Sequence, residues 1–507
     1  LSERLSEALA SLDSIPVARV TGRLIKVNGL MLQAVGCRFK LEQRCLVETA
    51  EGDMIEAQVV GFEHTIAYLM PIRRLGGLFA GAKVIPLDGD STVQLSAQWL
   101  GRVLNGLGEP LDDGAPLKGG DRVSLEPKPI NPLKRRPVDT PLNVGVRAIN
   151  GLLTVGKGQR IGLMAGSGVG KSVLMGMITK NTEADVIVVG LIGERGREVR
   201  EFIERNLTPE ARKKAIIIAA PADESPLMRL RATLLCHRVS EYFRDQGKDV
   251  LLLMDSLTRY AMAQREIALS LGEPPASRGY PPSVFSVLPQ LLERAGNSEN
   301  QHGSLTAIYT VLAEGDDQQD PVVDSARAIL DGHVVLSRQL AEQGHYPAID
   351  INASISRCMS TCTQEAHSTI AFEFSASAGS RWRPMTSIAV SLYSYEYPGH
   401  DIVTHSPQPE MPSLVTASTR MRSRTTSVPN SVERRSATAF GSVTTAVTNA
   451  YWRAGTTGGA GSGCAHRGDP TVGGASAGAG GDRAGVRALR VAADDRARRC
   501  DDPLDPR

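Results

Sequence analysis

A short glycine-rich segment constrains the fold of this chain more than any other feature. The apolar run from Arg160 to Ala165 leads into Gly-Ser-Gly-Val-Gly, and Lys171 and Ser172 follow at the start of a predicted helix. A strand, a glycine-rich loop and a helix in this order bind phosphate, because the glycines let successive backbone N–H groups turn toward phosphate oxygens at the helix N-terminus. The motif starts with Ala165 in place of glycine, and this small side chain still leaves room for the turn. The segment therefore predicts a nucleotide-binding P-loop.

The chemistry expected of this loop is the binding of ATP and Mg²⁺. Lys171 would reach the β- and γ-phosphates, and Ser172 would supply a hydroxyl to Mg²⁺, a hard cation that prefers oxygen ligands. Asp255 ends the apolar run 250–254, as a carboxylate at the end of a buried strand would, and it is expected to hold Mg²⁺ through water. A helix N-cap is the alternative role for Asp255. The predicted ATP-binding residues of the loop are Ala165, Gly166, Ser167, Gly168, Val169, Gly170, Lys171 and Ser172.

A carboxylate and two guanidinium groups follow another apolar run. Glu194 and Arg195 come directly after the segment 185–193. Phosphoryl transfer to water needs a group that orients and deprotonates the water, and Glu194 at a strand end suits this role. Arg195 would contact the γ-phosphate. The alternative is that these residues, with Arg197 and Glu198, form surface ion pairs at the start of a helix.

The remaining regions differ in their sequence pattern. We expect a short amphipathic helix at 1–16, where leucines recur at helical spacing, and its apolar stripe either packs on its own protein or docks on a partner. We also expect a small β-barrel at 17–90, where short runs such as 18–27 and 54–60 are broken by Gly, Asn and Asp. A turn-rich and proline-rich linker at 91–142 leads into a P-loop domain at 143–357. There, apolar strands alternate with helices, which predicts an α/β fold with a parallel sheet covered on both faces. The candidate strands are 160–165, 185–191, 215–220, 250–254 and 304–312.

Composition argues against several classes of protein. Hydrophobic residues make up 41% of the 507 residues, charged residues make up 22%, and the formal net charge is +2. Such a chain lacks the strong positive field of a nucleic-acid-binding protein. Its longest apolar runs are far shorter than the roughly 20 residues of a membrane-spanning helix. The 7 cysteines show no framework spacing and no leader opens the sequence, which fits a reducing cytoplasm. We expect no nucleic-acid partner and at most peripheral membrane association.

Three motifs together resemble one known family. The P-loop, the segment 193–199 (Gly-Glu-Arg-Gly-Arg-Glu-Val) and the segment 347–356 (Pro-Ala-Ile-Asp-Ile-Asn-Ala-Ser-Ile-Ser) are similar to the hexameric ATPases related to the α and β subunits of rotary ATP synthase. Within that family, the segments 255–267 and 272–284 resemble flagellar and type III secretion ATPases. The segments 314–321 and 344–350 look specifically like the flagellum-specific export ATPases of the FliI type. The resemblance covers about residues 1–357.

This resemblance implies roles for individual residues. Glu194 would polarise the attacking water, and Arg195 would lie beside the γ-phosphate. Tyr346 would pack against the adenine ring, a role that its flat apolar face suits. Arg357 would be an arginine finger that reaches into the site of a neighbouring subunit, a contribution worth about 10³–10⁵ in rate. The implied catalytic set is Lys171, Glu194, Arg195 and Arg357, with Mg²⁺ at Ser172 and Asp255.

The resemblance also implies an assembly with partners. The chain would form a homohexameric ring crowned by the barrels, and a regulatory stator protein would dock on the N-terminal helix. The ring would lie in the cytoplasm, peripheral at the flagellar base, where ATP hydrolysis near the export gate helps to release exported flagellar proteins from chaperones. An ATP synthase-type subunit or a virulence type III secretion ATPase is the alternative within the family. An RNA-translocating hexamer is disfavoured by the low charge and the 4% of aromatic residues, and a ring protein that binds ATP without turnover is the non-enzymatic alternative.

The match to the family ends after Arg357. The family continues with a helical domain, whereas residues 358–507 are first rich in Ser and Thr and then in Gly, Ala and Arg. We expect this region to be atypical and disordered, and a frameshift in place of the helical domain is our hypothesis for its origin. A genuine extension and a fused segment are the alternatives. Cys358, Cys362 and His367 have no common zinc-site spacing, so no metal site is expected there.

Overall fold

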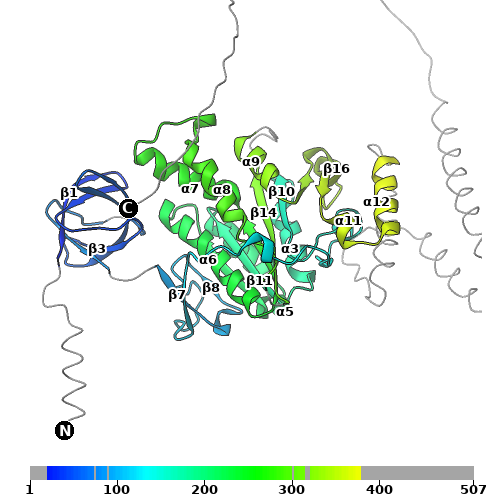
Figure 1. Ribbon diagram of the computed structural model, residues 1–507, viewed down its shortest axis with the longest axis horizontal. Coiled ribbons are helices and arrows are strands. Elements are labelled where there is room, and N and C mark those ends of the chain that lie inside the picture. Colours follow the sequence, from blue (N-terminus) through cyan, green and yellow to red (C-terminus); the bar gives the residue numbers. More distant parts are fainter. Residues whose placement is uncertain (1–19, 74–75, 88–90, 300–301, 314–319, 378–507) are drawn as a thin grey trace, which may run out of the picture. The chain divides into compact units, whose positions relative to one another are not determined.

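A computed structural model describes residues 20–73, 76–87, 91–299, 302–313 and 320–377 (Figure 1). The predicted docking helix at 1–16 and most of the segment 314–321 lie outside the described residues. The part of the chain that follows residue 20 forms a closed antiparallel barrel with the strand order β1-β2-β5-β4-β3-β6. Alternate side chains of these strands fill the barrel, including Leu24, Val59 and Leu69. The strands are β1 (Gly22–Asn28), β2 (Met31–Val35), β3 (Arg44–Glu48), β4 (Met54–Glu63), β5 (Ile66–Pro71) and β6 (Lys83–Pro86).

An eight-stranded sheet forms the centre of the next domain. Its order is β16-β15-β10-β14-β13-β11-β12-β8, and every neighbouring pair is parallel except β15 and β16. The predicted α/β fold with a parallel sheet is therefore confirmed, and its five candidate strands are found within one residue of their expected bounds. The strands are β8 (Val103–Leu104), β10 (Arg160–Ala165), β11 (Val186–Ile192), β12 (Ala215–Ala220), β13 (Asp249–Asp255), β14 (Ser304–Leu312), β15 (Gly332–Leu336) and β16 (Ile349–Ser356).

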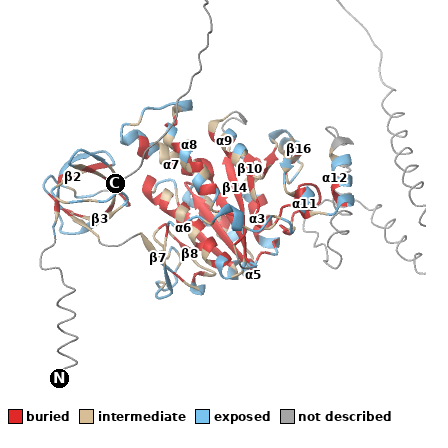
Figure 2. Cartoon of the chain, in the orientation of Figure 1, coloured by how far each residue is buried: buried red, intermediate tan, exposed pale blue. Residues whose placement is uncertain are grey.

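Helices cover both faces of this sheet, because strands such as β11 and β12 are apolar and buried at every position. Successive residues of β11 face opposite sides, so that Val188 packs in one apolar cluster and Val189 in the other. The first cluster includes α6 (Pro226–Asp245), α7 (Leu257–Ser270), α8 (Pro282–Leu292) and α9 (Pro321–Ile329). The second includes residues of α2 (Arg147–Leu152), α3 (Lys171–Asn181) and α4 (Gly196–Arg205). α5 (Pro209–Lys213) contacts α3 and β12. Figure 2 shows the buried strands between the two helical layers.

Residues 91–142, predicted to be a linker, also contribute to the sheet. β8 pairs in parallel with β12, where Val103 lies opposite Ile217 and Leu104 opposite Ile218. β7 (Thr92–Leu95) and β9 (Asp121–Ser124) form a separate two-stranded sheet. The predicted domain boundaries themselves stay predictions. The remaining short elements are η1 (Ala97–Trp99), η2 (Pro132–Lys134), η3 (Ser277–Gly279), α10 (Arg338–Glu342) and α11 (Met359–Cys362).

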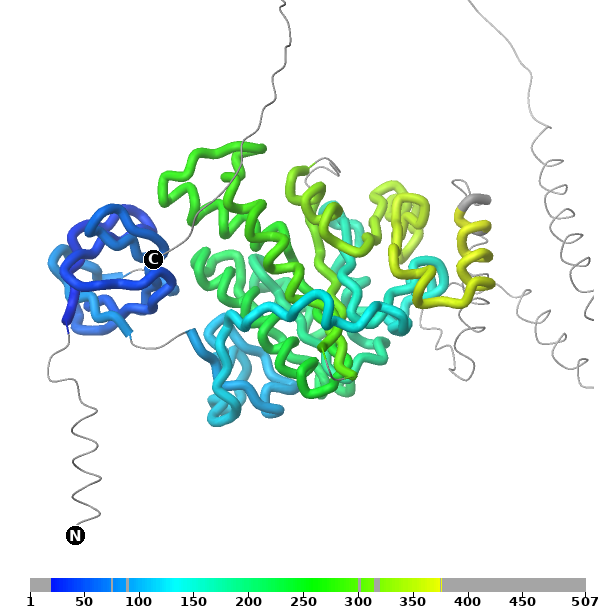
Figure 3. Tube along the Cα trace, viewed as in Figure 1, coloured from blue at the N-terminus to red at the C-terminus, as the bar shows by residue number. Residues whose placement is uncertain are grey.

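The described chain continues past Arg357 into two helices that the sequence analysis did not predict. α11 and α12 (Glu365–Ser377) follow β16, as the yellow end of the tube in Figure 3 shows, and Met359 and Ala371 join the second apolar cluster. His367 donates from Nε2 to the Gly151 carbonyl at 2.8 Å, so α12 is attached to α2. No group of metal-ligating side chains is found among the described residues. Within the same residues, no helix has the length and apolar character needed to cross a membrane.

Candidate active site

Two of the predicted catalytic residues, Lys171 and Glu194, meet the predicted metal ligand Asp255 at the carboxyl edge of the sheet. Lys171 follows β10 through the glycine-rich loop, Glu194 follows β11, and Asp255 is the last residue of β13. β10, β11 and β13 are parallel members of one sheet, so their carboxyl ends share an edge. Ligands bind at this edge in open α/β sheets. The side chains expected to serve the phosphates, the attacking water and Mg²⁺ therefore lie close together.

The glycine-rich loop has the backbone geometry that a phosphate cradle needs. Gly168 has φ +79° and Gly170 has φ +96°, both in the left-handed region where a Cβ atom is disfavoured. Gly170 is the N-cap of α3, so the helix begins at Lys171 with its first N–H groups at the loop. Ser172 lies in the first turn of α3 and is exposed. A phosphate group in this loop would meet both unpaired backbone N–H groups and the positive end of the α3 dipole.

One ammonium group faces two carboxylates beside the loop. Lys171 Nζ pairs with Asp255 Oδ1 in a short contact and lies 3.4 Å from Glu194 Oε1. Asp255 Oδ1 also accepts a hydrogen bond from the Thr310 hydroxyl at 2.6 Å. Burial alone would lower the pKa of Lys171, but the two carboxylates outweigh it and raise that pKa, so the ammonium stays charged. Burial raises the pKa of Asp255, an effect that Lys171 opposes.

The charges of this cluster suit an additional cation. Lys171, Glu194 and Asp255 are only 12%, 12% and 4% exposed at their side chains, and two carboxylates against one ammonium leave one negative charge in excess. A buried charge without a partner is unfavourable, so a divalent cation bound at this cluster would compensate the excess negative charge. The Asp255 carboxylate and the exposed Ser172 hydroxyl are the oxygen donors that Mg²⁺ prefers. The residues present therefore fit the predicted metal.

Tyr346 and Arg338 border the loop from another part of the chain. A Cβ atom built on Gly170 would lie 3.5 Å from the Tyr346 ring, which is 61% exposed as a residue and so presents an open face beside the loop. Arg338 Nη2 donates to the Ser167 carbonyl at 3.1 Å. A cavity of about 240 Å³ lies next to the loop, and its lining includes Ala165, Gly166, Ser337, Arg338 and Asp350. This position of Tyr346 is compatible with its predicted contact to adenine.

Arg195 lies outside the charged cluster. Its side chain is 84% exposed and lies 3.6 Å from Glu198, one turn along α4. The pairs Arg197–Glu201 and Arg200–Glu204 repeat this pattern along the helix. The contacts of Arg195 thus match the alternative of surface ion pairs at a helix start, and the contact of Arg195 with a γ-phosphate stays a prediction.

Arg357 lies at the amino-terminal end of the parallel strands, opposite the carboxyl edge that carries the P-loop. β15 is parallel to β10, and Leu336 pairs with Ala165 at the loop end. β16 runs the other way, so Ile349 lies opposite Leu336 and Ser356 lies at the far end of the pairing. Arg357 is the next residue. Since β10 has 6 residues and a strand rises about 3.3 Å per residue, the two edges are roughly 16 Å apart.

The Arg357 side chain is exposed at that edge. Its backbone N–H donates to the Asp331 carbonyl at 2.9 Å, and its guanidinium lies 3.4 Å from the Arg327 carbonyl at the end of α9. The fold of a single chain therefore separates Arg357 from the Lys171 cluster.

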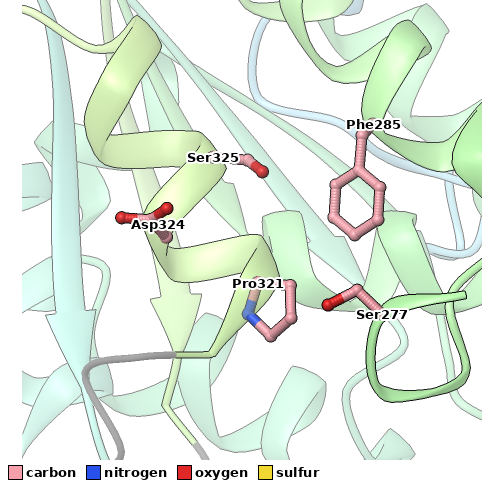
Figure 4. A pocket seen from close by; sticks show the side chains of 5 residues that line it. All are labelled: Ser277, Phe285, Pro321, Asp324 and Ser325. Atoms are coloured by element: carbon pink, nitrogen blue, oxygen red, sulfur yellow. The ribbon is translucent and has the colours of Figure 1, made fainter. Parts of the chain in front are cut away.

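A second cavity is separate from this site. It has a volume of about 510 Å³ and is lined by Ser277, Phe285, Pro321, Asp324 and Ser325, from η3, α8 and α9 (Figure 4). No predicted site residue lines it. We therefore assign no nucleotide to this cavity.

Sequence reasoning missed Thr310 and Arg338. Thr310 lies in a strand that was predicted, and the register that sets Met254 opposite Tyr309 brings Asp255 alongside it. The order of the strands, which makes β13 and β14 neighbours, was the missing information. Arg338 follows β15, a five-residue strand that the sequence analysis did not identify.

Comparison with known proteins gives a consistent picture. The nucleotide-binding domain model of the ATP synthase alpha/beta family matches residues 145–356. A flagellum-specific ATP synthase of Pseudomonas aeruginosa is 57% identical over 368 residues, which cover 72% of this chain and 81% of that protein. A flagellum-specific ATP synthase of Salmonella typhimurium is 54% identical over 385 residues, with coverage of 72% and 84%. A type 3 secretion system ATPase of Xanthomonas euvesicatoria is 46% identical over 361 residues, with coverage of 71% and 81%.

Solved structures agree with these relatives. The assembled ATPase EscN of the enteropathogenic E. coli type III secretion system has a TM-score of 0.66 and 40% identity, over 75% of this chain and 90% of that chain. EscN in complex with its central stalk EscO has a TM-score of 0.64 and 38% identity, over 80% and 93%. With the P-loop geometry, these likenesses show that this chain is a P-loop ATPase of the ATP synthase alpha/beta family and belongs to its flagellum-specific and type III secretion group.

Proposed function

We propose that this chain hydrolyses ATP to energise flagellar, type III protein export, and that it acts as a homohexameric ring whose active sites are shared between neighbouring subunits. Relatives that are 57% and 54% identical are flagellum-specific enzymes, which favours the flagellar over the virulence system. The near-neutral charge disfavours a nucleic-acid partner.

The cluster at the carboxyl edge supplies the chemistry. The loop N–H groups and Lys171 would bind the β- and γ-phosphates, and Ser172 and Asp255 would hold Mg²⁺. When bound, Mg²⁺ would neutralise charge that develops on the phosphoryl oxygens. Glu194 would orient a water molecule and accept its proton as the water oxygen attacks the γ-phosphorus and the bond to the β–γ bridging oxygen breaks. Tyr346 would pack on adenine, and Arg195 would approach the γ-phosphate.

One observation carries the proposal of a shared site. Arg357 and Lys171 lie at opposite edges of one sheet, roughly 16 Å apart by the rise of β10. A guanidinium group stabilises the transferring phosphoryl group only when it lies beside it. Arg357 can therefore serve a site only in another copy of the chain. EscN has been solved as an assembled ATPase and in complex with a central stalk, EscO, which supports a ring with protein partners.

The proposed partners follow from the same assignment. We expect a stator protein at the N-terminal segment 1–16, and the export gate, chaperones and exported flagellar proteins as further partners. The ring would lie in the cytoplasm, with peripheral attachment at the flagellar base.

The test is Mg²⁺-dependent ATP turnover of the full chain as a function of protein concentration. A shared site requires assembly, so the turnover per chain should rise steeply with concentration and level off once rings are complete. Glu194→Gln keeps the shape of the side chain and removes the carboxylate, and it should abolish turnover while ATP still binds. Turnover per chain that is constant down to concentrations at which the chain is monomeric would contradict the shared site. ATP binding without turnover at any concentration would instead support the non-enzymatic ring protein.

A further inference from the structure

Gln159 is a fully buried amide at the amino end of β10. The residue is 0% exposed. Its amide oxygen accepts a hydrogen bond from the Gly156 N–H at 2.8 Å, and its amide nitrogen donates to the Asp331 carbonyl and to the Ser356 hydroxyl, each at 3.1 Å. The amide therefore joins three segments that are far apart in the sequence, the loop before β10, the turn before β15 and the end of β16.

Two of these segments meet at Arg357. The Asp331 carbonyl that accepts from Gln159 also accepts from the Arg357 backbone N–H at 2.9 Å. Ser356 directly precedes Arg357, and its hydroxyl donates to the Thr154 carbonyl at 2.7 Å while it accepts from Gln159. Gln159 thus contacts both groups that fix the backbone from which the Arg357 side chain projects.

The Asp331 side chain is held independently of this amide. Its carboxylate accepts from the Arg160 backbone N–H and Nε, both at 3.0 Å, and from Nη2 at 3.1 Å. The turn before β15 is therefore already fixed to β10 without Gln159. The amide adds a direct hydrogen bond from β10 to Ser356, the last residue before Arg357.

We propose that Gln159 is a positioning residue for the arginine finger, whose amide fixes the end of β16 so that Arg357 projects toward the active site of a neighbouring subunit. This inference rests on the proposed function, in which Arg357 acts in trans. Displacement of a catalytic group by about 1 Å can cost about 10²-fold in rate. A buried amide with a partner for each donor resists such displacement, because any rotation would leave buried polar groups unpaired.

The matched variants are Gln159→Met and Thr306→Val. Met keeps the length and volume of the side chain but removes the amide. Thr306 is also 0% exposed and accepts from the N–H of Gly158, in the same loop, at 2.8 Å, so Thr306→Val removes a buried hydrogen bond without loss of the links to Asp331 and Ser356. We expect Gln159→Met to lower kcat by about 10- to 100-fold with KM for ATP unchanged. The kcat of Thr306→Val should stay within about twofold of the wild-type value.

Mixed rings separate positioning from general damage. A Gln159→Met chain keeps its own P-loop and Glu194, and a Glu194→Gln neighbour would supply an intact finger. Mixing these two variants should therefore raise turnover above the sum of the separate activities. Arg357→Ala mixed with Glu194→Gln is the reference for a finger in trans. Restoration in the reference mixture but not in the Gln159→Met mixture would overturn the positioning role and leave the proposed function intact.

Hydrogen exchange provides a readout that needs no turnover. In Gln159→Met, the peptide that contains Arg357 should exchange at least about tenfold faster, while peptides of the P-loop stay protected and ATP binding is unchanged. Ser356→Ala removes the hydroxyl that accepts from Gln159 and donates to Thr154, while the bond from Gln159 to Asp331 remains, and it should show the same effect; this variant covers the case in which Gln159→Met fails to fold. If neither mixture regains activity, the proposal that Arg357 acts in a neighbouring subunit is wrong. Faster exchange at Arg357 would then still support the role of Gln159 in fixing the backbone of Arg357. Unchanged exchange at Arg357 in both variants would refute the inference.

Discussion

Thr310 offers the sharpest test of how the proposed Mg²⁺ site is organised. Its hydroxyl donates to Asp255 Oδ1 at 2.6 Å, and both side chains are buried. Thr310→Val keeps the shape of the side chain but leaves the Asp255 carboxylate with Lys171 as its remaining partner at that oxygen. A hydrogen bond to a charged group contributes about 1.5–3 kcal/mol, and loss of a partner that orients a metal ligand costs about 10–100-fold in metal affinity or activity. We expect the Mg²⁺ concentration for half-maximal turnover to rise about tenfold.

The assay is ATP turnover of the full chain across a Mg²⁺ titration at saturating ATP. Thr306→Val is a matched control, because Thr306 is equally buried on the same strand but bonds Gly158 at the other edge of the sheet. Excess Mg²⁺ should restore most of the activity of Thr310→Val. An unchanged Mg²⁺ dependence in Thr310→Val, or an equal shift in Thr306→Val, would refute the argument that Thr310 orients Asp255.

Further predictions concern three other side chains. Glu194→Gln should lower kcat by at least about 10²-fold, since a general base contributes about 10²–10⁴-fold, and equilibrium binding of ATP should persist. Tyr346→Ala should weaken ATP binding about tenfold and Tyr346→Phe should not, because the ring face makes the proposed contact; equal losses in both would exclude stacking. Burial lowers the pKa of His237 to about 4, and its ring bonds the Thr233 carbonyl and the Tyr309 hydroxyl. The ordinary pKa of histidine is about 6.5, so at pH values between about 6.5 and 4 His237 is protonated in the unfolded chain but not in the folded chain. The free energy of unfolding should therefore fall by about 1.4 kcal/mol per pH unit as the pH decreases through this range. Urea unfolding at pH 7, 6 and 5 checks this slope, and His237→Gln should flatten it.

The strands and the charged cluster could be predicted because both depend on local pattern. An apolar run that ends in Asp255, or is followed by Glu194, indicates a strand whose carboxyl end carries a carboxylate. Parallel strands then bring such ends to one edge without further information. The P-loop adds a motif in which spacing, glycine content and the following helix agree. Lys171 could therefore be assigned with these carboxylates before any strand order was known.

Contacts between distant segments could not be predicted in this way. Gln159 lies 172 residues from Asp331 and 197 from Ser356, and nothing in the sequence indicates that one amide joins them. The two-residue strand β8 is too short to show a periodicity. α12 lies in a segment whose composition favours disorder, and its attachment to the sheet domain through His367 depends on the tertiary fold. Such features require the strand order and the packing of the sheet.

The most direct test of the shared active site is a mixing experiment with Glu194→Gln and Arg357→Ala chains. Each variant alone should turn over ATP at least about 10²-fold more slowly than the unchanged chain, because one lacks the base and the other lacks the finger. In mixed rings, an Arg357→Ala subunit keeps an intact P-loop and Glu194, and its Glu194→Gln neighbour provides Arg357. Turnover well above the sum of the two separate variants is the predicted result. Turnover equal to that sum, in mixtures shown to contain both chains in one ring, would contradict a site completed by Arg357 from a second subunit.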